Sequence, residues 1–124
     1  MAKVSVIIPS RNEHHKADTD KETTLQRTVR DVYEKATGDF EVIVAFDGPP
    51  YQGFPKYKNF TALRNKKAKG LKPCVNQMVD IAKGKYIYKT DAHCSFGKGF
   101  DEILQEKMED NWIVMPRFYV LNPD

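Results

Sequence analysis

The residues with the clearest chemical use are Asp91 and His93, which stand two positions apart in the segment Thr90-Asp91-Ala92-His93. Residues two apart in an extended or turning segment project to the same side, so this carboxylate and imidazole could reach one cation together. The pair suits manganese better than calcium, and magnesium would need further oxygen and water ligands. A cation bridging two phosphates stabilises a departing diphosphate as a Lewis acid. The alternative is that Asp91 caps a turn and His93 is an ordinary loop histidine.

A further carboxylate, Asp47, follows the β-branched run Phe40–Phe46, which the glycine and prolines at positions 48–50 break sharply. This pattern predicts a strand that presents Asp47 at its carboxyl end. Capping of the turn by a short acidic side chain is the alternative role.

Basic residues crowd one stretch of the chain, although the formal net charge is only +3. The stretch comprises Lys56, Lys58, Arg64, Lys66, Lys67, Lys69 and Lys72. Summed Coulomb potential attracts phosphates of any origin, so this stretch indicates an anionic partner without separating a nucleic acid from a nucleotide. A solvated, lysine-rich loop is the simpler interpretation.

Hydrophobic periodicity indicates strands that alternate with helices, as in α/β proteins. Strands are predicted at Val4–Pro9, Phe40–Phe46, Phe60–Leu63, Lys85–Thr90 and Trp112–Leu121. Helices are predicted from Thr23 to about Ala36, from Pro73 to about Ala82, and from Lys98 to about Met108. The predicted fold class is therefore an open, mainly parallel, Rossmann-like sheet with flanking helices. Such sheets bind ligands beyond the carboxyl ends of their strands, where Asp47 and Asp91 both fall.

Two common phosphate-binding motifs are absent. The turn Pro9-Ser10-Arg11-Asn12-Glu13 lacks the glycines of the dinucleotide fingerprint. The segment Gly97–Gly99 lacks the spacing of a P-loop. Any diphosphate must therefore be neutralised by other groups.

Length and composition predict one globular domain over residues 1–124. No apolar run is long enough to cross a bilayer and no leader pattern stands at the start, so a cytoplasmic location is expected by default. Cys74 and Cys94 match neither a zinc ribbon nor a redox pair, and reduced thiols are expected.

The order of these motifs resembles the nucleotide-diphospho-sugar glycosyltransferases of the GT-A fold, especially family two. The matching segments are VSVIIPSRNE (Val4–Glu13), FEVIVAFDG (Phe40–Gly48), Gly70–Asn76, Gly84–Ile87, TDAHC (Thr90–Cys94) and the pair Gly99-Phe100. Each motif is weak alone, but together their order and spacing cover nearly the whole chain.

The resemblance implies a donor domain that binds a UDP-sugar with Mn²⁺ or Mg²⁺ and transfers the sugar to an acceptor hydroxyl on a saccharide, lipid or protein. The implied donor-binding residues are Pro9, Arg11, Glu13, Asp47, Asn76 and Asp91, and the implied metal ligands are Asp91 and His93. Among them, Asp47 would accept a hydrogen bond from the base, Glu13 would lie near the ribose or base, and Asp91 would serve ribose and metal.

The sequence also departs from the family pattern. Val75 stands where many members have an arginine near the diphosphate, and Lys69, Lys72 or Arg64 are the candidate replacements. The acceptor half is missing or reduced to Trp112–Asp124, so a missing C-terminal half or a second chain would complete the site. No general base can be named, because the acidic residues from Asp101 to Asp110 fit a solvated helix face.

Other functions remain open on the sequence alone. A non-catalytic module that binds a nucleotide-sugar or saccharide would keep the donor motifs. A nucleic-acid-binding surface would use the basic stretch, with Tyr51, Phe54, Tyr57 and Phe60 stacking on bases. A zinc site from His14, His15, His93 and Cys94 has unsuitable spacing.

Overall fold

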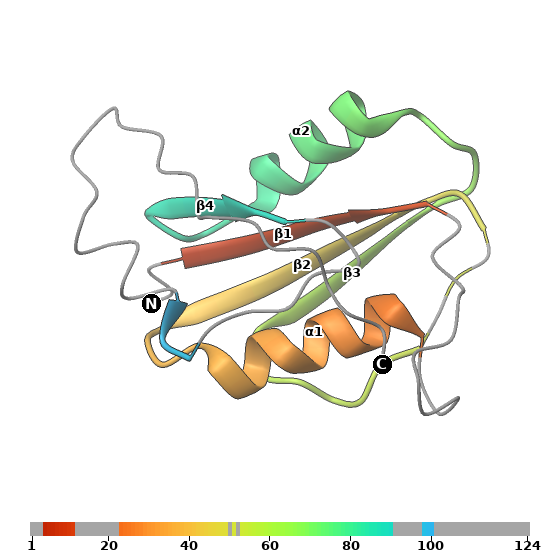
Figure 1. Ribbon diagram of the computed structural model, residues 1–124. Coiled ribbons are helices and arrows are strands. Elements are labelled where there is room, and N and C mark those ends of the chain that lie inside the picture. Colours follow the sequence, from red (N-terminus) through yellow and green to blue (C-terminus); the bar gives the residue numbers. More distant parts are fainter. Residues whose placement is uncertain (1–3, 12–22, 50, 52, 91–97, 101–124) are drawn as a thin grey trace.

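The fold is a parallel sheet with one helix on each face (Figure 1). The computed structural model describes residues 4–11, 23–49, 51, 53–90 and 98–100. In chain order the elements are β1 (Val4–Ser10), α1 (Thr24–Lys35), β2 (Phe40–Asp47), β3 (Phe60–Asn65), α2 (Leu71–Ile81) and β4 (Tyr86–Lys89). This arrangement confirms the predicted open α/β class.

The described strands form a four-stranded sheet in the order β3-β2-β1-β4, and every neighbouring pair is parallel. Val4 is in register with Phe40 on one side and with Tyr86 on the other. From β1 the chain adds β2 and β3 in one direction, and it then returns to place β4 on the opposite side of β1. The strand order therefore reverses between β1 and β4, and such a switch point is where open α/β sheets bind ligands, beyond the carboxyl ends of the strands.

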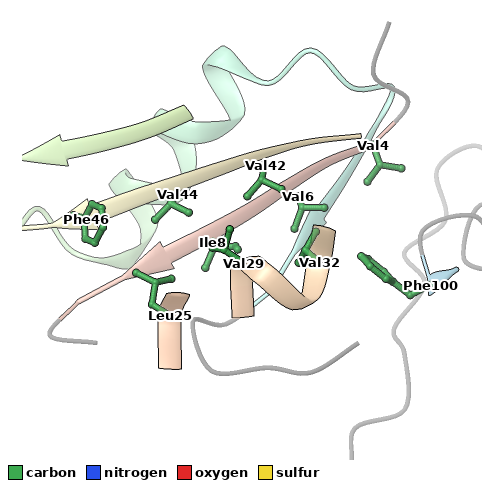
Figure 2. Packing of buried hydrophobic residues seen from close by; sticks show 10 residues of the cluster. All are labelled: Val4, Val6, Ile8, Leu25, Val29, Val32, Val42, Val44, Phe46 and Phe100. Atoms are coloured by element: carbon green, nitrogen blue, oxygen red, sulfur yellow. The ribbon is translucent and has the colours of Figure 1, made fainter. Parts of the chain in front are cut away.

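Even-numbered residues of β1 and β2 point towards α1 and form the larger core cluster (Figure 2). Its buried members are Val4, Val6, Ile8, Leu25, Val29, Val32, Val42, Val44, Phe46 and Phe100. The helix contributes Leu25, Val29 and Val32, which recur at four- and three-residue steps and so share one stripe. A capping box between Thr23 and Gln26 fixes the start of the helix.

Odd-numbered residues of the same strands point towards α2. Ile7, Ile43 and Ala45 pack there against Cys74 and Met78, and all of these side chains are fully buried. Because both faces of β1 and β2 are covered, most side chains of these strands are apolar, as is usual for parallel strands. Because the described strands are all parallel, their carboxyl ends lie at one edge of the sheet and their amino ends at the other.

Most predicted boundaries fall within one or two residues of the observed ones. The third strand is longer than expected, since it extends past Leu63 to Asn65. Phe100 is buried in the core on the α1 side of the sheet, with its ring centre 5.3 Å from that of Tyr88. The remainder of the predicted helix after Lys98 and the predicted strand Trp112–Leu121 lie outside the described residues. Among the helices that the structure describes, none has the length and apolar character needed to span a membrane.

Candidate functional site

The candidate site is the carboxyl edge of the sheet, where β1 ends at Ser10, β2 at Asp47 and β4 at Lys89. The backbone N–H of Thr90 donates to the carbonyl of Ile7 at 3.1 Å, so the chain is still held beside β1 where it leads into Asp91. Asp91 and His93 themselves lie outside the described residues, as does Glu13. The observed topology thus brings the ends of β1, β2 and β4 to one edge, as the sequence predicts.

Asp47 is buried, with an exposed fraction of 6%, and both of its carboxylate oxygens have backbone partners. Oδ1 accepts from the N–H of Lys69 at 2.5 Å, and Oδ2 accepts from the N–H of Gly70 at 2.9 Å. Gly70 has a φ of 96°, a left-handed conformation that favours glycine. Asp47 therefore clasps the turn that leads into α2.

Gly48 brings the same turn close to the end of β2. Its φ is 93°, and a Cβ built on it would stand 3.4 Å from the backbone nitrogen of Ala68. A larger residue would be strained by this φ and crowded by the neighbouring backbone. The Asp47–Gly48 corner and the Ala68–Gly70 turn are consequently fitted to each other.

The clasped segment carries much of the positive charge noted in the sequence. Its exposed basic residues are Arg64, Lys66, Lys67, Lys69 and Lys72. None of them forms an ion pair with another residue of the part that the structure describes. The guanidinium of Arg64 lies 5.8 Å from the centre of the Phe46 ring. These side chains form an unneutralised basic surface, which we call the basic turn (Arg64–Lys72).

The end of β1 presents a different set of groups. Pro9 is half-buried and is in register with Ala45, while Arg11 is exposed just beyond the strand. Ser10 is buried, and its hydroxyl has no hydrogen-bond partner among the described residues. An orphaned buried hydroxyl is uncommon in folded proteins. Sequence reasoning did not single out Ser10, because a serine before an arginine carries no distinctive signal.

Asn76 is not brought to this edge. It lies in the middle of α2, between the buried Cys74 and Met78, and is itself exposed. At about 100° per residue, a position two residues from each of them is on the opposite side of the helix. Its predicted donor contact stays a prediction, without support from this placement.

Cys74 is a buried residue near the start of α2, the helix that follows the basic turn. The Nδ2 of Asn65 donates a weak hydrogen bond to its Sγ at 3.8 Å. Burial raises the pKa of the thiol, the Asp47 carboxylate raises it further, and the Lys69 ammonium opposes them. The pKa of the Cys74 thiol therefore depends on the charges of both Asp47 and Lys69.

The aromatic side chains between β2 and β3 are packing anchors. Tyr57 stacks on Tyr33 with ring centres 4.2 Å apart, and Phe54 lies 5.0 Å from Phe60. The Tyr51 hydroxyl donates to the carbonyl of Asn65 at 2.5 Å. These rings pack against other parts of the chain. The structure therefore does not support the alternative in which they stack on the bases of a nucleic acid.

Residues 4–11, 23–49, 51, 53–90 and 98–100 contain no group of three or more His, Cys, Asp or Glu side chains that could hold a metal ion. The predicted metal ligands Asp91 and His93 follow β4 and lie outside these ranges. The residues of the alternative zinc site, His14, His15, His93 and Cys94, also lie outside the described part.

The parallel strand order and the switch point beside β1 define an open α/β domain, a class that commonly binds ligands beyond the carboxyl ends of its strands. Within that class the chain belongs to glycosyl transferase family 2, whose sequence profile matches residues 5–124. The chain is thus a glycosyltransferase-family domain, in agreement with the resemblance seen in the motifs.

Solved structures show the same fold. The chain is similar to S. aureus TarS 1-349, with a TM-score of 0.67 and 16% sequence identity over 93% of this chain and 38% of that one. It is equally similar to S. aureus TarS, with a TM-score of 0.67 and 16% identity, and covers 23% of that chain. A search of curated proteins found no match. The chain therefore spans less than two-fifths of the structures it resembles, and identity this low bears on the fold alone.

Proposed function

We propose that this chain is the donor-binding domain of a metal-dependent glycosyltransferase that takes a UDP-sugar and passes the sugar to an acceptor hydroxyl. Family membership supports the reaction class. The observation that carries the proposal is the reversal of strand order at β1, because it gathers the ends of β1, β2 and β4 at the edge where such sheets bind ligands.

In this proposal Asp91 and His93 hold Mn²⁺ or Mg²⁺, with Asp91 also near the ribose. A bound cation would supply charge neutralisation for the departing diphosphate. Pro9, Arg11 and Glu13 surround the nucleoside. The structure supports this indirectly, since Arg11 is exposed at the end of β1 and Thr90 holds the start of the Asp91 segment beside the same strand.

The acceptor, which would be a saccharide, a lipid or a protein, is assigned to a part of the site outside the described residues. A second chain or a C-terminal half would supply that part and the general base that deprotonates the acceptor hydroxyl. The proposal therefore concerns the donor side, and transfer needs this complement.

Calorimetry of the 124-residue chain with UDP and Mn²⁺ tests the donor site. We expect saturable binding that requires Mn²⁺ and weakens at least tenfold when Asp91→Ala and His93→Ala are combined. Asp80→Ala, on the exposed side of α2, is the matched control and leaves the affinity unchanged. Equal affinity in the wild type and the double variant would overturn the proposed site. Sustained release of UDP from a UDP-sugar would eliminate the non-catalytic binding module as the alternative.

A further inference from the structure

The Asp47 carboxylate is nearly inaccessible to a ligand. Its exposed fraction is 6%, and each oxygen already accepts a backbone N–H, from Lys69 and Gly70 respectively. Charge-assisted bonds of this kind are strong, and losing them would leave the buried N–H groups of the turn unpaired. The carboxylate therefore anchors the turn, whatever its remaining lone pairs accept.

The clasped turn, by contrast, is open to ligands. Lys69 and Lys72 flank Gly70 and are exposed, as are Lys66 and Lys67 just before them. Like charges in one short segment repel each other, so the turn holds its shape against their mutual repulsion. The two bonds to Asp47 and the close contact of Gly48 with Ala68 supply the opposing constraint.

We propose that Asp47 is a positioning residue: by clasping the Lys69–Gly70 turn, it holds the basic turn in place to bind the diphosphate of the sugar nucleotide. The inference rests on the proposed donor function. The turn is bound to the end of β2, which neighbours β1, so the turn lies at the carboxyl edge of the sheet, where we place the donor. In this proposal the lysines of the turn supply the positive charge that many family members obtain from an arginine at the position of Val75.

A comparison of UDP with CDP separates positioning from base recognition. Uracil carries a proton on N3 and cytosine does not, so a carboxylate that accepts from N3 discriminates between the two, whereas a basic turn treats their identical diphosphates alike. We would measure the affinities of both nucleotides with Mn²⁺ for the wild type, Asp47→Asn, Gly70→Ala and Lys69→Gln combined with Lys72→Gln. Lys58→Gln, an exposed lysine beside the start of β3, is the matched control.

Positioning predicts that Asp47→Asn, Gly70→Ala and the lysine pair each weaken UDP and CDP by the same factor, about tenfold, with the UDP-to-CDP ratio preserved. The Lys58 variant binds as the wild type does. Loss of the UDP preference in Asp47→Asn, with Gly70→Ala unchanged, would overturn the inference in favour of a base contact. Failure of the wild type to bind UDP would instead remove the proposed function.

Folding is controlled in the same series. Circular dichroism checks each variant, and hydrogen exchange at the amides of Lys69 and Gly70 reports on the clasp itself, with faster exchange expected in Asp47→Asn. Should that variant not fold, Gly70→Ala decides the matter, because it strains the left-handed turn while leaving the carboxylate intact. Unchanged affinity for both nucleotides in a folded Gly70→Ala protein would refute the inference.

Discussion

Strand β2 carries a buried acidic residue at each end, and the two act on opposite ends of α2. Asp47 accepts from the backbone at Lys69 and Gly70, before the helix. Glu41 accepts from the backbone N–H of Lys83, after the helix, at 2.5 Å. Both lie on the sheet face that α2 covers, so one strand fixes the helix at both termini.

The difference lies in what surrounds each carboxylate. Glu41 also accepts from the Ser5 hydroxyl at 2.5 Å, and that hydroxyl accepts from the N–H of Gly84 at 2.8 Å, which closes the network on itself. The Asp47 clasp instead supports an exposed turn of unpaired lysines. The same hydrogen-bonding device thus serves stability at the amino edge and, in our proposal, ligand binding at the carboxyl edge.

A groove of about 730 Å³ lies at the amino edge, where Asp39, Glu41, Lys58 and Lys83 contribute to its lining. It carries charges of both signs and is at the opposite end of the strands from the proposed donor site. Because open α/β sheets bind ligands at the carboxyl ends of their strands, we do not assign this groove to the sugar nucleotide.

The largest expected effect is the loss of stability in Gly84→Ala. The added Cβ would stand 2.6 Å from the Ser5 nitrogen and 2.7 Å from the carbonyl carbon of Val4. Both are backbone atoms of β1, so the clash can be relieved only by a shift of the strand or of the turn at Gly84. Overpacking of this kind costs about 3 kcal/mol. Urea denaturation measures the loss, and Gly53→Ala, where a Cβ meets nothing within 4 Å, is the control. If the comparison holds, UDP affinity of the folded variant is unchanged.

Glu41→Gln should weaken the amino-edge network by about 2 kcal/mol, because hydrogen bonds to a charged acceptor become bonds to a neutral one. Thermal unfolding should show the loss, with Glu34→Gln, at an exposed helix position, close to the wild type. The UDP affinity should not change. A tenfold loss of UDP affinity in Glu41→Gln would contradict the assignment of the amino edge to stability and of the carboxyl edge to ligand binding.

A smaller effect appears at alkaline pH through Tyr33, whose hydroxyl donates to the carbonyl of Lys58 at 2.7 Å. Burial raises the pKa of this phenol, and Tyr57 and Glu41 raise it further. In the unfolded chain a tyrosine ionises near pH 10, so the stability contribution is complete below about pH 10 and declines as the pH rises above it. Denaturation at pH 8 and pH 11 should show a decline that is shallower in Tyr33→Phe. An equal decline in both proteins would contradict this assignment.

The smallest expected effect is a change in the pKa of Cys74, which reports on the carboxyl edge without altering the fold. In a Cys94→Ser background, thiolate absorbance should show that Asp47→Asn lowers this pKa, because a nearby negative charge is removed. Lys69→Gln should raise it, because the opposing positive charge is lost. Identical titrations in all three proteins would show that the clasp charges do not reach the thiol.

Much of the fold was predictable because apolar side chains specify it locally. Continuous β-branched runs marked β1 and β2 as strands buried on both faces, and the stripe of Leu25, Val29 and Val32 marked α1. The extension of β3 to Asn65 was missed, since it depends on pairing with Asp47 of β2 and not on local hydrophobicity. Register of this kind is a tertiary property.

The position of Asp47 in the fold could be predicted from the sequence, but its hydrogen-bond partners could not. A carboxylate after a parallel strand had to fall at the carboxyl edge, and Asp47 does so. Its backbone partners Lys69 and Gly70 are far away in sequence, and nothing in the residue pattern showed that its oxygens would be occupied. The exposed position of Asn76 likewise depends on which side of α2 meets the sheet.

The place of β1 in the sheet has a consequence for biosynthesis. Among the described strands β1 is synthesised first, yet it is an inner strand, paired with β2 on one side and with β4 on the other. One flank of β1 must wait until Tyr86–Lys89 have been translated, and until then it offers an unpaired, apolar edge. Folding of the described sheet during synthesis is therefore expected in two stages, in which β1 pairs with β2 before it pairs with β4.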